Sequence, residues 1–134
     1  MINFSSNQHK KFYYDNLQKV QHQDVYDKSL IYCLGLDSDT RNNIDRIYNF
    51  ERECIKVSCL SDDWQTSGSL QVTRMAFNLY CNNTPSVNMY HKTEEKIREC
   101  RKYSVADLFC SSYAPYFWQA LQLRYPDFTD FKEE

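Results

Sequence analysis

The chain has 134 residues and a mass of 16.1 kDa, which fits one domain, and its 42% hydrophobic and 25% charged residues are ordinary for a globular protein. Its net charge of −2 and pI near 5.9 exclude a general nucleic-acid binder, because such proteins need a broad positive field. No apolar stretch is long enough to span a membrane, and residues 1–20 lack the apolar core of a secretory signal. We therefore expect a single domain over residues 1–134 in the cytoplasm, with no membrane partner and with residues 126–134 as a frayed tail.

The first third of the chain carries clear helix signals. Ser5 and Gln8 have the spacing of a capping box, and the helix that follows them is expected to reach about Gln21. Asp24 opens a second helix, which Gly35 ends. We expect Gly35 to adopt the left-handed conformation that is common for glycine at the C-terminal end of a helix.

The middle of the chain mixes clear and ambiguous signals. The residues DSDT at 37–40 start a third helix. Residues 50–61, FERECIKVSCLS, fit helical and strand spacing alike, and we expect a short helix followed by irregular chain. Apolar residues then recur at helical spacing from Val72 to Tyr80, and Asn82, Asn83 and Pro85 end that helix.

The C-terminal third predicts further helices. A charged helix or turn follows Thr93, and Ser104 with Asp107 caps the next piece. Two helical pieces meet at Pro115, because proline suits a first turn and breaks a helix interior. Pro126 ends the second piece. With 11 Tyr, 8 Phe and 2 Trp, the chain predicts an all-α domain of five to seven short helices with an aromatic-rich core.

The polar loop before the helix around Val72 is the most site-like feature. Its candidate residues for binding an anion or nucleotide are Trp64, Thr66, Ser67, Gly68, Ser69 and Arg74. A helix N-terminus offers unpaired N–H groups to an anion, and Gly68 lets a ligand approach the backbone closely. The alternative interpretation is a capped helix start, with Ser67 or Ser69 as the cap. A binding site requires that Trp64 be partly exposed and that Arg74 lack an internal carboxylate partner.

The sequence shows no catalytic constellation. His9, His22 and His91 are expected to be exposed, since none stands in a motif with a nucleophile or an acid. Asp62 and Asp63 are expected to be solvated or to cap a turn. The six cysteines lack zinc-ligand spacing, and we expect them to be reduced thiols. We therefore predict no catalytic residue, no metal site and no cofactor.

The aromatic segment SSYAPYFWQALQLRYPDF is a second candidate surface. Trp, Tyr and Arg are favoured anchors of protein interfaces. At helical spacing such residues are usually core, so we expect Phe117 and Leu121 inside the domain. Trp118, Arg124 and Tyr125 are expected partly outside, where they could contact a partner.

Three stretches of this sequence are familiar as a set: YDKSLIYCLGLDSDTRNNIDRIY, DWQTSGSLQVTRMAFNLY and DLFCSSYAPYFWQALQLRYP. Over roughly residues 8–126 the chain resembles an uncharacterised family of small proteins from Firmicutes and from their phages and mobile elements. The matching residues are Trp64, Gln65, Thr66, Ser69, Thr73, Arg74, Ala76, Phe77, Asn78, Leu79, Leu108, Phe109, Pro115, Tyr116, Phe117, Arg124, Tyr125 and Pro126. Asp63 stands where the family often has glycine. The resemblance implies a bacterial or phage accessory protein and supplies no catalytic residue.

Three functions remain open at this point. We favour a non-enzymatic binding protein of a phage or mobile element that sequesters a host defence protein, as anti-CRISPR proteins do, or a small nucleotide signal. The second is a small enzyme acting on a nucleotide or phosphoester, with Arg74 as an electrostatic clamp. The third is a structural or regulatory module that forms a homo-oligomer without a ligand.

Overall fold

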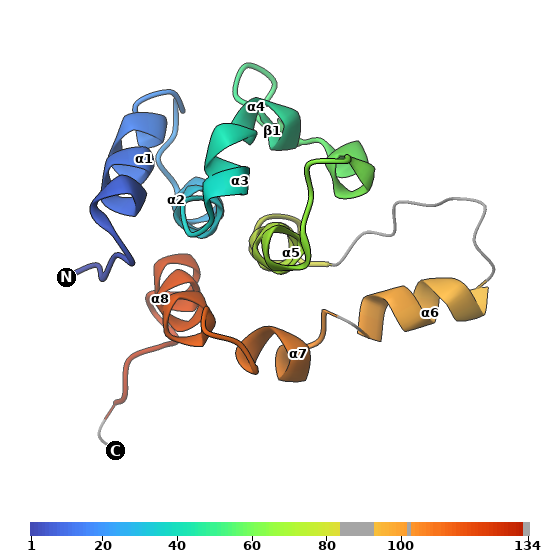
Figure 1. Ribbon diagram of the computed structural model, residues 1–134. Coiled ribbons are helices and arrows are strands. Elements are labelled where there is room, and N and C mark those ends of the chain that lie inside the picture. The colour runs from blue at the N-terminus through green and yellow to red at the C-terminus, as the bar shows by residue number, and fades with distance from the viewer. Residues whose placement is uncertain (84–92, 102, 133–134) are drawn as a thin grey trace.

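The computed structural model of the chain describes residues 1–83, 93–101 and 103–132, and helices dominate over these residues (Figure 1). They form α1 (Asn7–Leu17), α2 (Val25–Leu34), α3 (Ser38–Asn42), α4 (Ile44–Ile47), α5 (Ser67–Cys81), α6 (Thr93–Arg101), α7 (Val105–Phe109) and α8 (Ala114–Arg124). The predicted all-α class is confirmed. The third predicted helix is divided at Asn43, whose φ of −118° interrupts the helical backbone between α3 and α4.

Residues 50–61 are where the local prediction was wrong. They contain no α-helix: β1 (Tyr48–Asn49) pairs antiparallel with β2 (Cys54–Ile55), and a 3₁₀ helix, η1 (Val57–Ser61), follows. Residues of α2 and α5 stabilise the hairpin. The Tyr48 hydroxyl donates to Asp27 Oδ1 at 3.1 Å, and the Tyr80 hydroxyl donates to the carbonyl of Glu53 at 2.8 Å. Tertiary contacts of this kind override a weak helical propensity.

Helix α2 is the centre of the core. Residues 30–34 are all fully buried, which requires neighbours on every side of the helix. Figure 1 shows α2 surrounded by α1, α5 and α8, and the core residues of these helices form one hydrophobic cluster with it. The remaining core residues lie in α4, β1, η1 and α7 and, at Val20 and Leu36, in two connections. The buried aromatic side chains of this cluster confirm the predicted aromatic-rich core.

His9 belongs to this interior, contrary to the expectation that it is exposed. It is fully buried, and its ring centroid lies 4.5 Å from that of Tyr32. Nε2–H donates to the carbonyl of Tyr32 at 2.7 Å, and Nδ1 accepts from the backbone N–H of Ser5 at 3.1 Å. This pairing satisfies both nitrogens of a neutral ring. Burial lowers the pKa of His9 to about 4, although the bond to Tyr32 acts in the opposite direction.

Gly35 ends α2 as predicted, but for a different reason. Its φ is −77°, so the expected left-handed conformation is wrong. A Cβ at this position would lie 2.5 Å from His9 Cδ2 and 2.9 Å from Phe12 Cδ1. The absence of a side chain therefore lets α1 approach the end of α2 closely.

Several predicted helix ends are confirmed by the geometry of their caps. Asp24 accepts from the N–H of Asp27 at the start of α2, and Asp37 caps α3 in the same way. Asn82, with a φ of 61°, ends α5 in the left-handed region. At the start of α1 the cap is Ser6 rather than Ser5. Pro85 and His91 lie outside the described residues.

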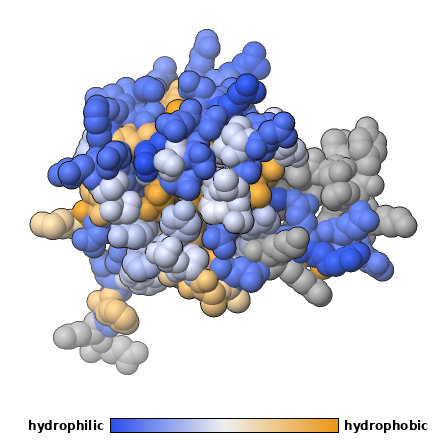
Figure 2. All heavy atoms as spheres, viewed as in Figure 1, coloured by the Kyte–Doolittle hydropathy of each residue, from blue (hydrophilic) through white to orange (hydrophobic). Residues whose placement is uncertain are grey.

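The described surface is largely hydrophilic on the face shown in Figure 2, apart from scattered apolar groups and a C-terminal tail that stands away from the body. Helix α8 ends at Arg124, and residues 126–128 after it are exposed. Over the described part of the chain, no helix has the length and apolar character needed to cross a membrane.

Candidate functional site

The loop before α5 is a helix cap that uses its own hydroxyl groups. Thr66 Oγ1 accepts from the N–H of Ser69 at 3.1 Å, and Ser69 Oγ accepts from the N–H of Thr66 at 2.7 Å. Ser69 Oγ also lies 2.6 Å from Gln65 Oε1, to which it donates. The cap residue is therefore Thr66, and Ser69 is its partner in a reciprocal capping box, whereas the sequence had favoured Ser67 or Ser69 as the cap.

Trp64 and Gly68 face protein groups at this loop. Trp64 is half-buried, and its Nε1–H donates to Asp62 Oδ2 at 2.9 Å. That carboxylate brings negative charge to the loop, which opposes the binding of an anion. Gly68 lies within α5, and a Cβ there would be 3.4 Å from the Tyr113 hydroxyl. Ser67 is exposed in the first turn of α5.

Arg74 is a buried residue of α5 that contacts α6. Its side chain is 2% exposed and forms an ion pair with Glu99 of α6. Its guanidinium carbon also lies 4.6 Å from the centroid of the Tyr103 ring. The condition that Arg74 lack a carboxylate partner is therefore not met. The sequence did not single out Glu99 as this partner, because the 25 positions between the two residues exceed the reach of local patterns.

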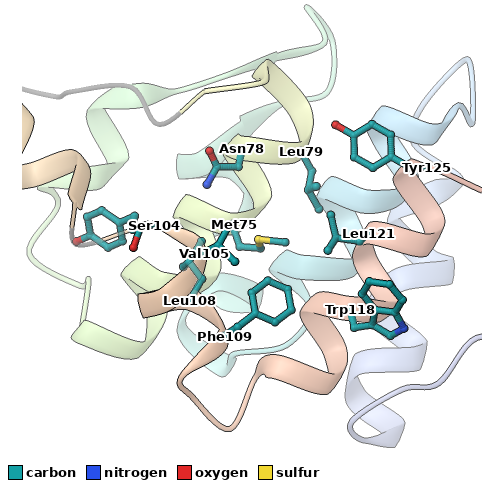
Figure 3. Close-up of a pocket in the computed structure, with 11 residues that line it drawn as sticks. Met75, Asn78, Leu79, Ser104, Val105, Leu108, Phe109, Trp118, Leu121 and Tyr125 are labelled. Atoms are coloured by element: carbon teal, nitrogen blue, oxygen red, sulfur yellow. The ribbon is translucent and has the colours of Figure 1, made fainter. Parts of the chain in front are cut away.

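A cavity of about 650 Å³ opens elsewhere, between α5, α7 and α8 (Figure 3). We call it the α5–α7–α8 groove. Its lining residues are Met75, Asn78, Leu79, Tyr103, Ser104, Val105, Leu108, Phe109, Trp118, Leu121 and Tyr125. Ligand sites in proteins are commonly concave, mostly apolar and furnished with a few polar groups, and this groove has that character.

The walls of the groove come from three helices that present apolar side chains to one space. Figure 3 shows Met75 from α5, Leu108 and Phe109 from α7, and Leu121 from α8 directed toward a common centre. Asn78 supplies an amide beside them. The groove combines an apolar floor with polar groups at its margin, which suits an apolar segment that also carries polar groups.

Two groove residues leave large apolar surfaces open to solvent. Trp118 is 48% exposed and Val105 is 74% exposed. Both residues line the same cavity, and exposed apolar side chains gathered around a cavity are typical of an interaction surface. The groove is therefore the described feature with the clearest binding character.

The three residues predicted to face a partner separate into two groups. Trp118 and Tyr125 both line the groove. Arg124 does not, and the expectation that it lies partly outside is wrong, because it is buried. Its Nε–H donates to the carbonyl of Leu79 at 2.8 Å, and its guanidinium carbon lies 3.8 Å from the ring centroid of Tyr26.

Arg124 has a structural role that follows from these contacts. Leu79 lies in the last turn of α5, where backbone carbonyls lack partners within the helix. A cationic side chain at this end satisfies a carbonyl and interacts favourably with the helix dipole. Arg124 also lies 3.3 Å from Asn82 Oδ1, so it joins the end of α8 to the end of α5 and supports one wall of the groove.

Sequence reasoning identified only part of the groove. The α5 residues Met75 and Leu79 belong to the apolar series predicted at helical spacing from Val72 to Tyr80, and both are buried. Nothing local showed that α7 and α8 leave a space over that face. The α7 sequence offered one signal, because Val105, Leu108 and Phe109 form an apolar stripe on a helix too short to cover much of its neighbours.

Metal ligands and buried thiols give no sign of reactivity in residues 1–83, 93–101 and 103–132, whereas Cys54 and Cys110 are exposed. No group of three or more His, Cys, Asp or Glu side chains there could hold a metal ion. Burial raises the pKa of the Cys33 thiol, and it raises that of Cys59 to about 12. Both thiols are therefore held in the unreactive protonated form.

Comparison with known proteins places the whole chain in a family. No curated protein and no solved structure matches it. A family model described as "Family of unknown function (DUF6075)" matches residues 1–134, which include both the loop before α5 and the α5–α7–α8 groove. Because this match covers the entire length, the chain belongs to the family of unknown function DUF6075.

Proposed function

We propose that this protein is a non-enzymatic binding protein that sequesters a protein partner through the α5–α7–α8 groove. The observation that carries the proposal is the groove itself: a cavity of about 650 Å³ with apolar walls and an exposed aromatic rim at Trp118. Such a surface is suited to burying apolar side chains of a partner. The residues that line it include no His, Cys, Asp or Glu, the side chains that most often act as nucleophile or base.

The shape of the groove favours a helical or extended segment as the part of the partner that enters. Grooves between helices commonly receive an amphipathic helix, whose apolar side chains at positions i, i+3 or i+4, and i+7 fill successive pockets. Leu108, Leu121 and Met75 would form the floor for such side chains. Asn78 and the hydroxyl of Tyr125 would orient the segment through its polar groups.

The biological setting of the proposal comes from resemblance to small proteins of Firmicutes, phages and mobile elements. In that setting the partner is a host defence protein in the bacterial cytoplasm, and occlusion of its working surface is the mode of action, as for anti-CRISPR proteins. Membership in a family of unknown function is compatible with this setting.

The nucleotide version of the proposal has less support. It depended on the loop before α5, where Thr66 and Ser69 use their hydroxyls for capping and Asp62 adds a carboxylate. Arg74, the cation expected to clamp a phosphate, is paired with Glu99 in the interior. The same pairing removes the main support for an enzyme that uses Arg74 as an electrostatic clamp.

The test compares a groove variant with a surface control. Tagged wild type, Val105→Lys and Gln21→Lys would be used to capture proteins from a host lysate. Val105 lines the groove and Gln21 is exposed in the connection between α1 and α2. Both changes add the same charge, and both sites are exposed enough to spare the core.

A captured protein would then be identified, purified and titrated against each variant by calorimetry. We expect Val105→Lys to weaken binding by about tenfold or more, and Gln21→Lys to bind as wild type does. Equal affinity of Val105→Lys and wild type would overturn the groove as the binding surface. Chemical alteration of the partner by the protein would overturn the non-enzymatic part of the proposal.

A further inference from the structure

The C-terminal tail carries two exposed phenylalanines. Phe128 is 87% exposed, and Phe131 is fully exposed. The start of the tail has a defined conformation, because the N–H of Phe128 and the hydroxyl of Thr129 both donate to the carbonyl of Tyr125, at 3.1 and 2.8 Å. Two large aromatic side chains so close together in a short segment are a hydrophobic anchor without a partner in the isolated chain.

The apolar groove lies beside the point where the tail begins, but the tail does not enter it. Tyr125 lines the groove and precedes Phe128 by three residues. Figures 1 and 3 both show the chain after α8 leading away from α5 and α7. The turn fixed by the Tyr125 carbonyl sets this direction. Each molecule thus presents an apolar groove and a tail with two phenylalanines exposed to solvent.

We propose that the C-terminal tail of a second copy of this chain occupies the α5–α7–α8 groove, with Phe128 and Phe131 inserted between the three helices. If each copy gives its tail and receives the other, the assembly is a homodimer with two-fold symmetry and two equivalent grooves. The same surfaces are used twice, so the contact closes and does not continue into a filament.

The area available is sufficient for a stable dimer. A phenylalanine buries roughly 150–250 Å², so four of them contribute roughly 600–1,000 Å². The groove walls lose a similar area, which brings the total to roughly 1,200–2,000 Å², the range of stable protein interfaces. The half-exposed Trp118 and the exposed Val105 at the rim would be covered by the same event.

The inference shares the groove with the proposed function but needs no foreign partner. Occupation by the tail would cover the groove until a foreign segment displaces it, so the dimer would be the resting state of the binding protein. Removing the two phenylalanines would open the groove without altering its walls. The two proposals are therefore separable by experiment.

The first experiment measures native mass across a concentration series by sedimentation or light scattering. Wild type is compared with the double variant Phe128→Ala/Phe131→Ala and with the matched control Asp127→Ala/Asp130→Ala. The control changes two residues of the same tail and keeps both rings. We expect dimers for wild type and control, and a folded monomer for the double phenylalanine variant. A wild type that stays monomeric at its highest soluble concentration would overturn the proposal, as would an unchanged dimer of the double variant.

The second experiment places the tail in the groove directly. A labelled peptide of residues 126–134 is titrated into the full-length Phe128→Ala/Phe131→Ala protein, and binding is followed by fluorescence anisotropy. Saturable binding is expected, and addition of Val105→Lys to the receiving protein should weaken it by about tenfold. Absence of binding, or equal binding by the Val105→Lys protein, would contradict insertion at the groove.

The same double variant separates this inference from the proposed function. If self-association is wrong but the proposed function is right, wild type is a monomer, and a captured partner binds wild type and the double variant equally well, with Val105→Lys weakening binding in both. If the proposed function is wrong but self-association is right, wild type is a dimer and the double variant is a monomer. In that case no captured partner binds Val105→Lys more weakly than wild type.

Discussion

Arg74 and Glu99 form an ion pair that joins α5 to α6, with the Arg74 side chain 2% exposed and the Glu99 side chain 17% exposed. The guanidinium also stacks against Tyr103 at 4.6 Å. These contacts give Arg74 a role in stabilising the fold. Loss of its charge would leave the partly buried Glu99 without that counter-ion.

Replacing Arg74 with Ala is expected to lower the free energy of unfolding by about 3 kcal/mol, because one partner of a buried pair is removed. The matched control is Lys11→Ala, which breaks the exposed ion pair with Asp15 and should cost about 0–1 kcal/mol. Urea denaturation measures both. A change of similar size in the two variants would contradict the structural importance of the Arg74–Glu99 pair.

Gly35 and Gly68 provide a second pair of matched substitutions. Gly35→Ala would place a Cβ 2.5 Å from His9, so we expect a destabilisation of about 1–3 kcal/mol from overpacking. Gly68→Ala meets the Tyr113 hydroxyl at 3.4 Å and Thr66 Oγ1 at 3.9 Å, and it should be neutral or stabilise α5 by about 0.4–1 kcal/mol. Thermal unfolding of the two variants distinguishes these outcomes. Equal melting temperatures would show that α1 moves away from α2 at little cost.

His9 should make the fold sensitive to acid. Its folded pKa of about 4 lies below the usual 6.5, so the unfolded chain binds more protons between these values. The contribution of His9 to the free energy of unfolding is therefore fully present above pH 6.5, and it decreases as the pH falls toward 4. His9→Gln should flatten this dependence, measured by urea denaturation at several pH values. Titration of the His9 ring protons near pH 6.5 by NMR would contradict it.

Asp27 should act in the opposite direction. Asp27 is buried, and its Oδ1 accepts a hydrogen bond from the Tyr48 hydroxyl at 3.1 Å. Tyr48 Oη also lies 3.1 Å from Tyr80 Oη, and Tyr80 donates to the carbonyl of Glu53. The hydrogen bond donated by Tyr48 favours the carboxylate form of Asp27, but the burial of Asp27 outweighs it. Burial, followed by the charge of Asp24, raises the pKa of Asp27 to about 6.

This raised pKa means that the folded state binds more protons than the unfolded state between about pH 4 and 6. The contribution of Asp27 to stability is therefore present at low pH and is lost as the pH rises through this window. Asp27→Asn is neutral at every pH and avoids the cost of a buried charge, so it should be more stable than wild type above pH 6 and lose that advantage near pH 4. The difference between the two proteins, measured at each pH, cancels the effect of His9. A less stable Asp27→Asn at pH 7 would contradict this account.

The groove was accessible to sequence reasoning only in part. Trp118 and Tyr125 were singled out because aromatic residues are favoured at interfaces, and both line the groove. Arg124 was chosen on the same ground, yet it is buried against Leu79 and Tyr26. Composition indicates which residues can anchor a partner, but it does not indicate which of them the domain uses for its own packing.

The sequence by itself determined the fold class and several helix ends. Caps such as Asp24, Asp37 and Asn82 act within three or four residues, and their chemistry can be read from a short window. The tertiary structure decided the rest. The burial of His9 depends on the carbonyl of Tyr32, 23 positions away, and the pairing of Arg74 depends on Glu99, 25 positions away. The groove exists because three helices from distant parts of the chain leave a space between them. Local patterns carry no information about such distances, since only the packing of whole helices brings these residues together.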